Sequence, residues 1–460
     1  MRWKSEKVLV IGLDCSPPRL LFEEFRDFLP NMRMLMDEGI SLPLRTCHPP
    51  ITIPAWMVAA TGRNPGEMGI YGFRHRKDYS YKDFWITTSD RIAVPKVWDV
   101  LAREGKRSIL VGIPPSYPPY EVHGNLISCF ITPDTNREFT HPVGLKTELE
   151  ELVGEYIFDV VFRTEERERL LEGLYEMSTQ SFKVIEYMMK EKPWEFLMFV
   201  EIGVDRIQHA FWKYFDSTHP KHEPDHKYKN AILDYYKFLD AHIGRLLSLL
   251  DTKTTVLVMS DHGAKAMKGA FCINEWLIQE GYLVLKQYPP EIKSFGELEV
   301  DWSRTKAWGW GGYHARIFIN KKGREREGVV EEKEYESLRE ELVQKLGKIR
   351  GPQEEVWQTR AYQVEKLYPE LKGDYPDIMV YLDDLWWRSA GTVGRKSLYL
   401  GENDTGPDDA VHDWDGIFIL WDKRGKIPGI DEASSFMKIE QIAPVILGLF
   451  GLDGQLTGKK

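Results

Sequence analysis

Carboxylates and imidazoles occur in two pairs whose spacing suits metal binding. Asp261 and His262 end an apolar run, and Gly263 behind them permits the turn that brings both side chains to one centre. Asp205 and His209 stand at positions i and i+4, so on a helix both project from one face and can hold one ion. Zn²⁺ suits such mixed ligands, and Mn²⁺ or Fe²⁺ also accept them. Taken alone, each pair is also compatible with an ordinary cap or a solvated surface pair.

Three further groups stand where a strand or a helix would deliver them. Asp14 ends the apolar run that starts at Lys7, and His412 precedes another apolar run. Thr52 comes just before Pro54, which is well placed near a helix start, where backbone N–H groups and the helix dipole favour an anion. A threonine there is either a helix cap or a nucleophile. Two metal ions that share a substrate, as in phosphoryl transfer, would use all seven groups: Asp14, Thr52, Asp205, His209, Asp261, His262 and His412.

The elements that must position these groups follow an α/β pattern. Apolar, β-rich runs are typical of strands buried in a parallel sheet, and they alternate with amphipathic helical patterns. Ligands gather at the carboxyl ends of the strands in an open α/β sheet, and Asp14 and Asp261 both stand at such ends. We expect a mostly parallel sheet with helices on both faces. The predicted strands are 7–14, 107–113, 194–200 and 256–259, and the predicted helices are 22–38, 97–103, 231–250 and 439–452.

The chain departs from this pattern in two regions. Residues 114–190 begin with prolines, aromatics and polar residues and continue as charged helical patterns, which predicts a helical and loop insertion away from the sheet. Residues 283–409 contain strand-like runs at 315–320 and 377–382, and we expect a strand-containing cap that faces the substrate. No internal repeat is present, so the chain 1–460 is predicted to be one interrupted catalytic domain. The second region is rich in tryptophan, including Trp302, Trp308, Trp310, Trp386 and Trp387.

Composition narrows the classes of partner. A net charge of −10 argues against a general nucleic-acid binder, although a bound metal can still attract a phosphate group. The chain has no apolar stretch long enough to cross a membrane, and its first apolar segment is too short for a secretory signal, so we expect a soluble, cytoplasmic protein without membrane partners. The sequence leaves the oligomeric state open. The cysteines lack metal-type spacing and are predicted to be buried thiols: Cys15, Cys47, Cys129 and Cys272.

A basic cluster follows the loop that comes after the threonine. The loop 63–73 is punctuated by glycines and leads into Arg74, His75 and Arg76. Guanidinium groups on such a loop can bind a phosphate group bidentately. We therefore take Arg74 and Arg76 as candidate substrate-binding residues, with a solvated basic patch as the alternative.

The order of these motifs resembles the alkaline phosphatase superfamily, and within it the type I phosphodiesterase/nucleotide pyrophosphatase family. The resemblance runs from Asp14 to His412 and implies an alkaline-phosphatase-like three-layer sandwich, with a mostly parallel central sheet and inserted cap segments. The motifs that carry it are the strand ending at Asp14, Thr52-Ile-Pro-Ala55 ahead of Thr61-Gly-Arg-Asn-Pro-Gly66, Asp205 with His209, Ser260-Asp-His-Gly263, and His412.

The resemblance also implies a mechanism and a set of metal ligands. Thr52 would be the nucleophile of a metal-dependent phosphodiesterase or nucleotide pyrophosphatase, acting through a phospho-threonine intermediate. A metal at the hydroxyl would lower its pKa enough for attack at neutral pH. The substrate would be a small phosphate ester or nucleotide, with no nucleic-acid polymer as partner. One ion would be held by Asp205, His209 and His412, and the other by Asp14, Thr52, Asp261 and His262.

Several readings compete with this one. A sulfatase is the nearest, because Cys47-His-Pro-Pro-Ile51 begins like its cysteine-x-proline signature, yet Ile51 stands where an arginine should follow. A phosphomonoesterase of the same superfamily is another alternative. A non-catalytic pseudoenzyme should lack some of the ligands, whereas here all are present. Two departures concern the substrate rather than the reaction class: Tyr71–Arg76 replaces the phosphate-binding asparagine of relatives, and Met68 stands where relatives often carry histidine.

Overall fold

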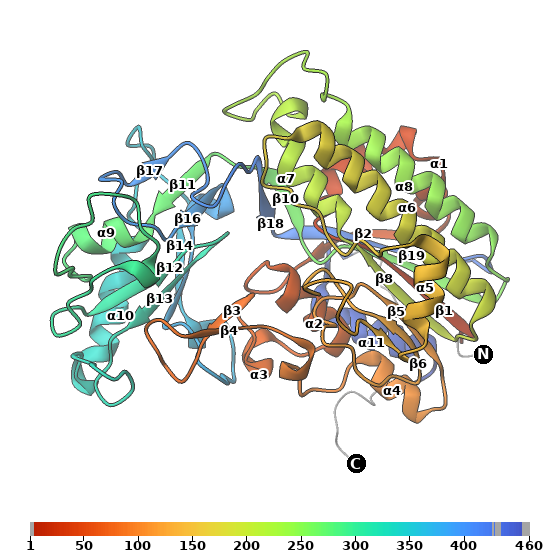
Figure 1. Cartoon of the computed structure of the whole chain (residues 1–460), viewed down its shortest axis with the longest axis horizontal. Helices are drawn as coiled ribbons and strands as arrows, with labels where there is room; N and C mark the ends of the chain where they lie inside the picture. The colour runs from red at the N-terminus through yellow and green to blue at the C-terminus, as the bar shows by residue number, and fades with distance from the viewer. Residues whose placement is uncertain (1–3, 426, 428–433, 453–460) are drawn as a thin grey trace.

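A nine-stranded sheet forms the centre of the larger lobe, in the order β20-β2-β19-β9-β1-β8-β5-β6-β7 (Figure 1). The computed structural model describes residues 4–425, 427 and 434–452. Neighbouring strands from β9 through β1, β8 and β5 to β6 are parallel, whereas β19 is antiparallel to both β2 and β9. The sheet is thus mostly parallel, as predicted. Its strands are β1 (Lys7–Leu13), β2 (Ile40–Arg45), β5 (Ser108–Val111), β6 (Gly124–Ile127), β7 (Thr140–His141), β8 (Phe196–Glu201), β9 (Thr254–Met259), β19 (Asp415–Asp422) and β20 (Met437–Lys438).

Helices cover both faces of this sheet and form the outer layers of the predicted sandwich (Figure 1). Side chains of a strand alternate between faces, so in β1 Leu9 and Ile11 belong to one core and Val8 and Val10 to the other. Each fully buried aliphatic side chain stabilises the fold by about 1.5–3 kcal/mol. The first core is completed by α1 (Pro30–Glu38), α5 (Leu145–Val153), α6 (Arg167–Glu191), α7 (Gly203–Phe215) and α8 (Ala231–Ser248), and the second by α2 (Thr52–Thr61), α4 (Val97–Arg103) and α11 (Ile442–Leu449).

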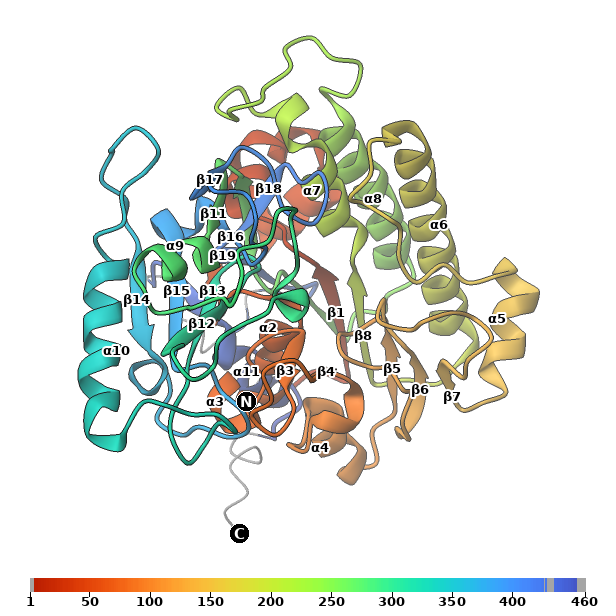
Figure 2. The same ribbon diagram turned by 60° about the vertical axis from the view of Figure 1, so that its left-hand side comes forward.

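A smaller lobe is built from the predicted cap region 283–409 together with residues 269–279, which lie ahead of the predicted start, and Figure 2 shows it beside the main sheet. Its antiparallel sheet has the order β12-β13-β15-β14, and α10 packs on β14. Trp308 is fully buried and stacks on Phe318, so this tryptophan holds the lobe together instead of facing a ligand. The elements are β11 (Gly269–Cys272), α9 (Ile273–Gln279), β12 (Ala307–Trp310), β13 (Ala315–Ile319), α10 (Glu332–Leu346), β14 (Arg360–Gln363), β15 (Ile378–Tyr381), β16 (Trp387–Ala390) and β17 (Tyr399–Leu400).

Two predictions from the sequence need correction. Residues 114–190 do not leave the sheet throughout, because β6 and β7 extend it beyond β5. The four-residue strand β6 is too short, and too closely flanked by prolines, for its apolar pattern to stand out. The predicted helix 22–38 is also broken: a π-helical turn at Arg19–Glu24 comes first, and α1 begins only at Pro30. Proline lacks the N–H that a continuing helix needs but fits at a helix start.

The sheet topology brings the predicted ligands to one edge. The parallel strands β1, β8 and β9 all end there, and β2 ends there as well because β19 lies antiparallel to both β2 and β9. The antiparallel direction of β19 also means that β19 starts at this edge, where the preceding strand β18 (Ala410–Asp413) ends. Ligands that are far apart in the sequence therefore converge. The remaining short elements are α3 (Pro65–Met68), β3 (Arg74–Arg76), β4 (Phe84–Ile86) and β10 (Gly263–Ala266).

Two simpler predictions concern the cysteines and membranes. The four cysteines lie in the described residues, and all are buried and outside any disulfide, as predicted. Among the described helices, none is both long enough and apolar enough to cross a bilayer.

Candidate metal centre

The first ligand group combines one acid and two histidines. Asp205 and His209 lie one turn apart on α7, and His412 reaches them from β18. The Nε2 atoms of His209 and His412 lie 3.2 Å and 3.7 Å from the same oxygen, Oδ1 of Asp205. Two ligands at about 2 Å from an ion and at the tetrahedral angle lie about 3.3 Å apart. The three atoms therefore have the spacing of ligands around a single ion.

The second group lies next to the first and contains the threonine. Nε2 of His262 lies 3.2 Å from Oδ2 of Asp261 and 3.9 Å from Oδ1 of Asp14. The same nitrogen is 3.4 Å from Oγ1 of Thr52. The rings of His262 and His412 stack with centroids 3.8 Å apart, so the two groups share a border. The structure thus brings together all seven ligands expected from the sequence, each of them buried.

Each of the three carboxylates has one oxygen held and the other bare. Oδ2 of Asp14 accepts from the Trp56 indole at 2.7 Å, and Oδ2 of Asp205 accepts from Arg206 at 2.6 Å. The backbone N–H of Cys15 reaches Oδ1 of Asp261 at 3.2 Å. The opposite oxygens, which face the histidines, are buried without a hydrogen-bond partner in the described structure. Buried unpartnered carboxylate oxygens are costly, and a bound cation removes that cost, so these residues fit two divalent ions.

The three histidines are oriented by acceptors behind them. Nδ1 of His209 lies 2.7 Å from Oδ1 of Asp408, and Nδ1 of His412 lies 2.7 Å from the carbonyl oxygen of Pro50. Nδ1 of His262 is 3.2 Å from the carbonyl oxygen of Gly263. An acceptor at Nδ1 places the proton there and leaves the lone pair of Nε2 for a metal. All three Nε2 atoms consequently face the bare carboxylate oxygens.

Burial and neighbouring charges shift the pKa values of the acids and histidines in the two ligand groups. Burial lowers the pKa of His262 to about 4, which keeps this imidazole neutral and able to bind a metal. Burial, and then the charge of Asp205, raise the pKa of Asp14 well above its usual value. Burial opposes the charge on His209 as well, but Asp408 and Asp205 outweigh it and raise its pKa to about 9. Positive charge is therefore favoured among these acids, which is the condition a metal ion meets.

Thr52 is the first residue of α2 and does not act as a cap. Ile51 occupies the N-cap position, and no side chain caps this helix. The threonine hydroxyl instead faces His262, beside the free N–H groups of the first helical turn. Gly12 helps to fix this arrangement, because a side chain there would meet the Trp56 ring at 2.6 Å. Trp56 can thus lie against β1 and hold Asp14.

Cys15 lies with the first ligand group, although sequence reasoning took it only as a buried thiol. Its Sγ and the ligand atoms of Asp205, His209 and His412 all lie within 4.8 Å of one another. A thiol at this distance can complete a four-ligand shell around an ion, and zinc accepts sulfur together with nitrogen and oxygen. Its position directly after Asp14, at the end of a strand, was the available signal.

A polar cluster covers the first ligand group, with Tyr313 and Arg388 from the smaller lobe and Arg163 from the segment between α5 and α6. The ring of Tyr313 stacks on His412 with centroids 3.8 Å apart, and its hydroxyl lies 3.2 Å from Nε2 of His209. Arg163 donates to that hydroxyl at 3.0 Å, and both Arg163 and Arg388 donate to Asp408. Because two guanidinium groups face one carboxylate, the cluster adds net positive charge beside the centre. Sequence reasoning missed these residues, since they come together only through the lobe.

Arg74 and Arg76, the predicted substrate-binding residues, do not contact the side chains of the two candidate metal-binding groups. Both lie in β3, in a hairpin between the two lobes (Figure 1). The Arg76 guanidinium is fully buried and pairs with Glu325 at 2.9 Å. Arg74 is exposed, and its carbonyl oxygen accepts from Arg316 of the smaller lobe. Arg76 is thus occupied in joining the hairpin to the lobe, whereas the Arg74 guanidinium is not engaged by any described acid.

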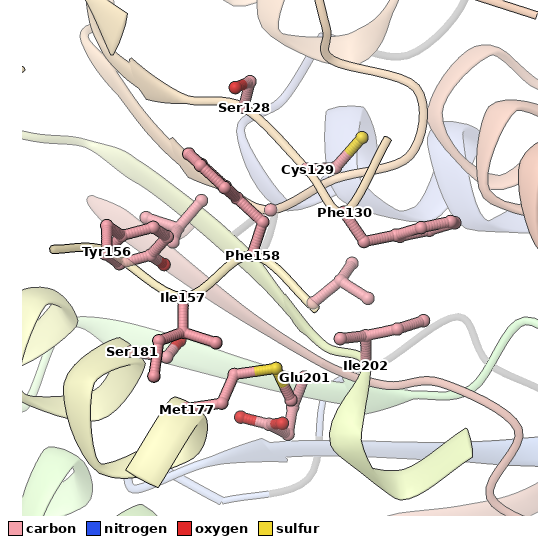
Figure 3. A pocket seen from close by; sticks show the side chains of 13 residues that line it. Ser128, Cys129, Phe130, Tyr156, Ile157, Phe158, Met177, Ser181, Glu201 and Ile202 are labelled. Carbon is pink, nitrogen blue, oxygen red and sulfur yellow. The ribbon is translucent and has the colours of Figure 1, made fainter. Parts of the chain in front are cut away.

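A separate cavity lies beyond the strand ends of β5, β6 and β8, and Figure 3 shows its lining. Tyr156, Phe158 and Met177 enclose it, with the Glu201 carboxylate at its base. Its volume of about 30 Å³ leaves room for roughly one water molecule. Glu201 already accepts from Ser178 at 2.9 Å, so this cavity is a small packing feature apart from the metal ligands.

The sandwich fold, the two groups of candidate ligands and the threonine beside them define an α/β protein with a candidate metal site. Residues 8–408 match the type I phosphodiesterase/nucleotide pyrophosphatase family. The chain therefore belongs to this family, which lies within the alkaline phosphatase superfamily, and it is a hydrolase of the phosphodiesterase/pyrophosphatase type. A comparison with curated proteins gave no match.

Solved structures share the fold over nearly the whole chain. Phosphonoacetate hydrolase from Sinorhizobium meliloti 1021, solved with phosphonoformate, is 14% identical with a TM-score of 0.61, covering 96% of this chain and 95% of its own. Human ectonucleotide pyrophosphatase/phosphodiesterase 5 is 14% identical with a TM-score of 0.57, covering 97% and 95%. An inactive threonine-to-alanine variant of the murine protein of that name, in complex with AMP, is 14% identical with a TM-score of 0.55, covering 97% and 95%.

Proposed function

We propose that the protein is a metal-dependent phosphodiesterase that uses Thr52 as its nucleophile. One observation carries the proposal: Oγ1 of Thr52 lies at the start of α2, 3.4 Å from Nε2 of His262 and beside bare carboxylate oxygens. A hydroxyl in that position can be activated by a cation, and the helix N-terminus can receive the phosphate group. The inactive threonine-to-alanine variant of the murine neighbour is consistent with a catalytic threonine on this fold.

Two divalent ions would occupy the centre, and Zn²⁺ is the ion best matched to its nitrogen, oxygen and sulfur donors. When bound, they lower the pKa of the Thr52 hydroxyl and offset charge on the phosphoryl oxygens. We assign one ion to Asp205, His209 and His412, with Cys15 beside it. We assign the other to Asp14, Thr52, Asp261 and His262.

The reaction proceeds in two displacements. Oγ1 of Thr52 bonds to phosphorus as the bond to the leaving oxygen breaks, which releases an alcohol and leaves a phosphoryl ester on Thr52. Water then bonds to phosphorus, the Thr52 ester bond breaks, and the hydroxyl is restored. The net reaction converts a diester and water into an alcohol and a monoester. Tyr313 can donate its hydroxyl proton to a phosphoryl oxygen, because burial and the charge of Asp408 raise its pKa and keep the phenol protonated.

We assign the contact with the charged substrate to Arg163. Its side chain is 26% exposed, whereas the other guanidinium on Asp408, that of Arg388, is 5% exposed. Arg163 also touches Tyr313, so it lies at the open side of the centre. A small phosphate ester or nucleotide could enter there, in line with the AMP and phosphonate ligands of the structural neighbours.

A panel of esters with one leaving group tests the reaction class. The zinc-loaded protein would be assayed with bis(para-nitrophenyl) phosphate, para-nitrophenyl phosphate and para-nitrophenyl sulfate, and separately with phosphonoacetate. We expect the highest kcat/KM for the diester and its loss on chelation. If the sulfate ester or phosphonoacetate is hydrolysed faster than the diester, the protein catalyses another reaction of the superfamily. A monoester rate above the diester rate would show that it is a phosphomonoesterase.

A further inference from the structure

Arg316 differs from every other buried arginine that the structure describes. Arg76, Arg167, Arg206, Arg339 and Arg388 each have a carboxylate oxygen within 4.0 Å. Arg316 is only 8% exposed, and no described carboxylate lies within that distance. A guanidinium carries five N–H donors and cannot lose its charge in a protein. Buried charges are normally paired, so an unpaired one calls for an anion that the chain itself does not supply.

The neighbours of Arg316 are basic or neutral. Its NH1 donates to the carbonyl oxygen of Arg74 at 2.7 Å, and its guanidinium lies over the Trp310 ring. Burial, together with the charge of Arg74, lowers the pKa of Arg316 to about 10. His314 stands two residues earlier, directly ahead of β13, is 5% exposed, and has both ring nitrogens buried without a hydrogen-bond partner in the described structure. Arg74 and His314 thus bring further donors close to Arg316, while the acceptor that the described structure gives its guanidinium is the Arg74 carbonyl oxygen.

This cluster lies next to the metal centre. Tyr313 stacks on His412, and the following residue, His314, belongs to the cluster. The ring of His314 lies 5.8 Å from that of Tyr381, whose hydroxyl is 3.1 Å from Nδ1 of His48, four positions before Thr52. The loop that covers the ions therefore continues directly into the basic cluster. A substrate held at Thr52 could extend to Arg316 with the part of the molecule that is not cleaved.

We propose that Arg316, Arg74 and His314 form a subsite for a second oxyanion, a phosphate or carboxylate group that the substrate carries beyond the reacting phosphorus. The subsite rests on the proposed phosphodiesterase function, because it selects among the diesters that Thr52 would attack. Arg316 binds the oxyanion through its planar fork, and neutral His314 contributes one N–H. Arg74, which lies at the surface, adds charge at the entrance.

Matched synthetic diesters test the subsite. Propyl, 2-carboxyethyl and 2-phosphoethyl para-nitrophenyl phosphate share a leaving group and differ in the second charge. We expect the wild-type protein to hydrolyse an acidic ester with a kcat/KM about tenfold to a hundredfold above that of the propyl ester, mainly through KM. The acidic ester with the larger increase in kcat/KM over the propyl ester identifies which oxyanion, carboxylate or phosphate, the subsite prefers. Arg316→Met should abolish this preference and leave the propyl ester nearly unchanged, while Arg316→Lys should keep part of it.

A control variant separates the subsite from the stability of the lobe. Arg339→Met removes another buried arginine of the same lobe, one that is paired with Glu365, and should keep the preference for acidic esters in whatever fraction folds. Equal rates for propyl and acidic esters in the wild type, or a preference that survives Arg316→Met, would overturn the subsite.

A binding measurement keeps the subsite testable if no ester is hydrolysed. Calorimetric titration of the zinc-loaded protein with inorganic phosphate should give two binding events, one at the centre and one at the subsite. Arg316→Met should remove the second event and keep the first. Two binding events in a protein that hydrolyses none of the esters would contradict the proposed function and support the subsite. Ester hydrolysis together with a single binding event that Arg316→Met does not alter would support the proposed function and contradict the subsite.

Discussion

Oδ1 of Asp408 accepts a hydrogen bond from Nδ1 of His209 at 2.7 Å, although 199 positions separate the two residues. Arg163 and Arg388 bind the other oxygen of this carboxylate. Burial alone would raise the pKa of Asp408, but His209 and the arginines hold it well below its usual value. A charged Asp408 fixes the His209 ring with Nε2 turned toward Oδ1 of Asp205. We therefore propose that Asp408 is a positioning residue for the metal centre.

Asp408→Asn should weaken metal binding about tenfold to a hundredfold, because the amide cannot hold the imidazole as a carboxylate does. Zinc affinity measured against a competing chelator reports this directly. Asp409→Asn is the matched control, since the Asp409 carboxylate lies 3.9 Å from Arg167, and the hydrogen bond from Asp409 to the His209 carbonyl oxygen comes from its backbone N–H, which the substitution keeps. Equal zinc affinity for Asp408→Asn and the wild type would show that the hydrogen bond is incidental.

Chelation should lower the thermal unfolding midpoint of the wild-type protein. The bare oxygens of Asp14, Asp205 and Asp261 lose their counter-charge when the ions leave. Zinc at a thousand times its Kd stabilises a folded protein by about 4 kcal/mol. The unfolding midpoint of Asp261→Asn should lie above that of the wild type after chelation and below it with zinc bound. An unfolding midpoint that is indifferent to both zinc and chelator would contradict the metal assignment.

Cys15 should bind cobalt as a thiolate. The Co²⁺-substituted protein should show a thiolate-to-cobalt charge-transfer band in the near ultraviolet, which Cys15→Ser removes. Cys129→Ser replaces another buried thiol, one that belongs to neither ligand group, and should keep the band. Tyr313→Phe should keep it as well, because a phenol oxygen cannot produce a sulfur band. A band that persists in Cys15→Ser would exclude sulfur ligation by this residue.

Arg163 and Arg76 should respond differently to removal of their charge. Arg163→Met should lower diester kcat/KM by about a hundredfold with little change in stability, since the guanidinium borders the centre and is partly exposed. Arg76→Met removes one of two arginines on the buried Glu325, which Arg324 still contacts at 3.0 Å; losing this charged hydrogen bond costs about 1.5–3 kcal/mol of stability, so the unfolding midpoint should fall. Denaturant unfolding and steady-state kinetics on the folded fraction separate the two effects. If both folded variants lose kcat/KM to a similar extent, Arg76 would have to be a substrate-binding residue, as the sequence predicted.

The sequence predicted best those features that depend on strand ends and helical spacing. Asp14 and Asp261 follow apolar runs, and Asp205 with His209 follows the helical period, so local pattern was enough to find them. His412 was predicted from its place before an apolar run, but the antiparallel direction of that strand, β19, has no local sequence signal and was not predicted. Asp408, Tyr313 and Arg388 were missed because their roles arise where the smaller lobe meets the sheet, a packing relationship that has no sequence period. The pair of acids just ahead of His412 was the one available hint.

Thr52→Ala gives the most direct test of the account, with hydrolysis of bis(para-nitrophenyl) phosphate measured at full zinc occupancy. Removing the hydroxyl leaves six of the seven ligands in place, so the ions should stay bound while the first displacement loses its attacking atom. We expect kcat to fall by about a thousandfold or more, with Thr52→Ser retaining a measurable rate. A Thr52→Ala variant that still turns over within tenfold of the wild type would mean that another group attacks phosphorus.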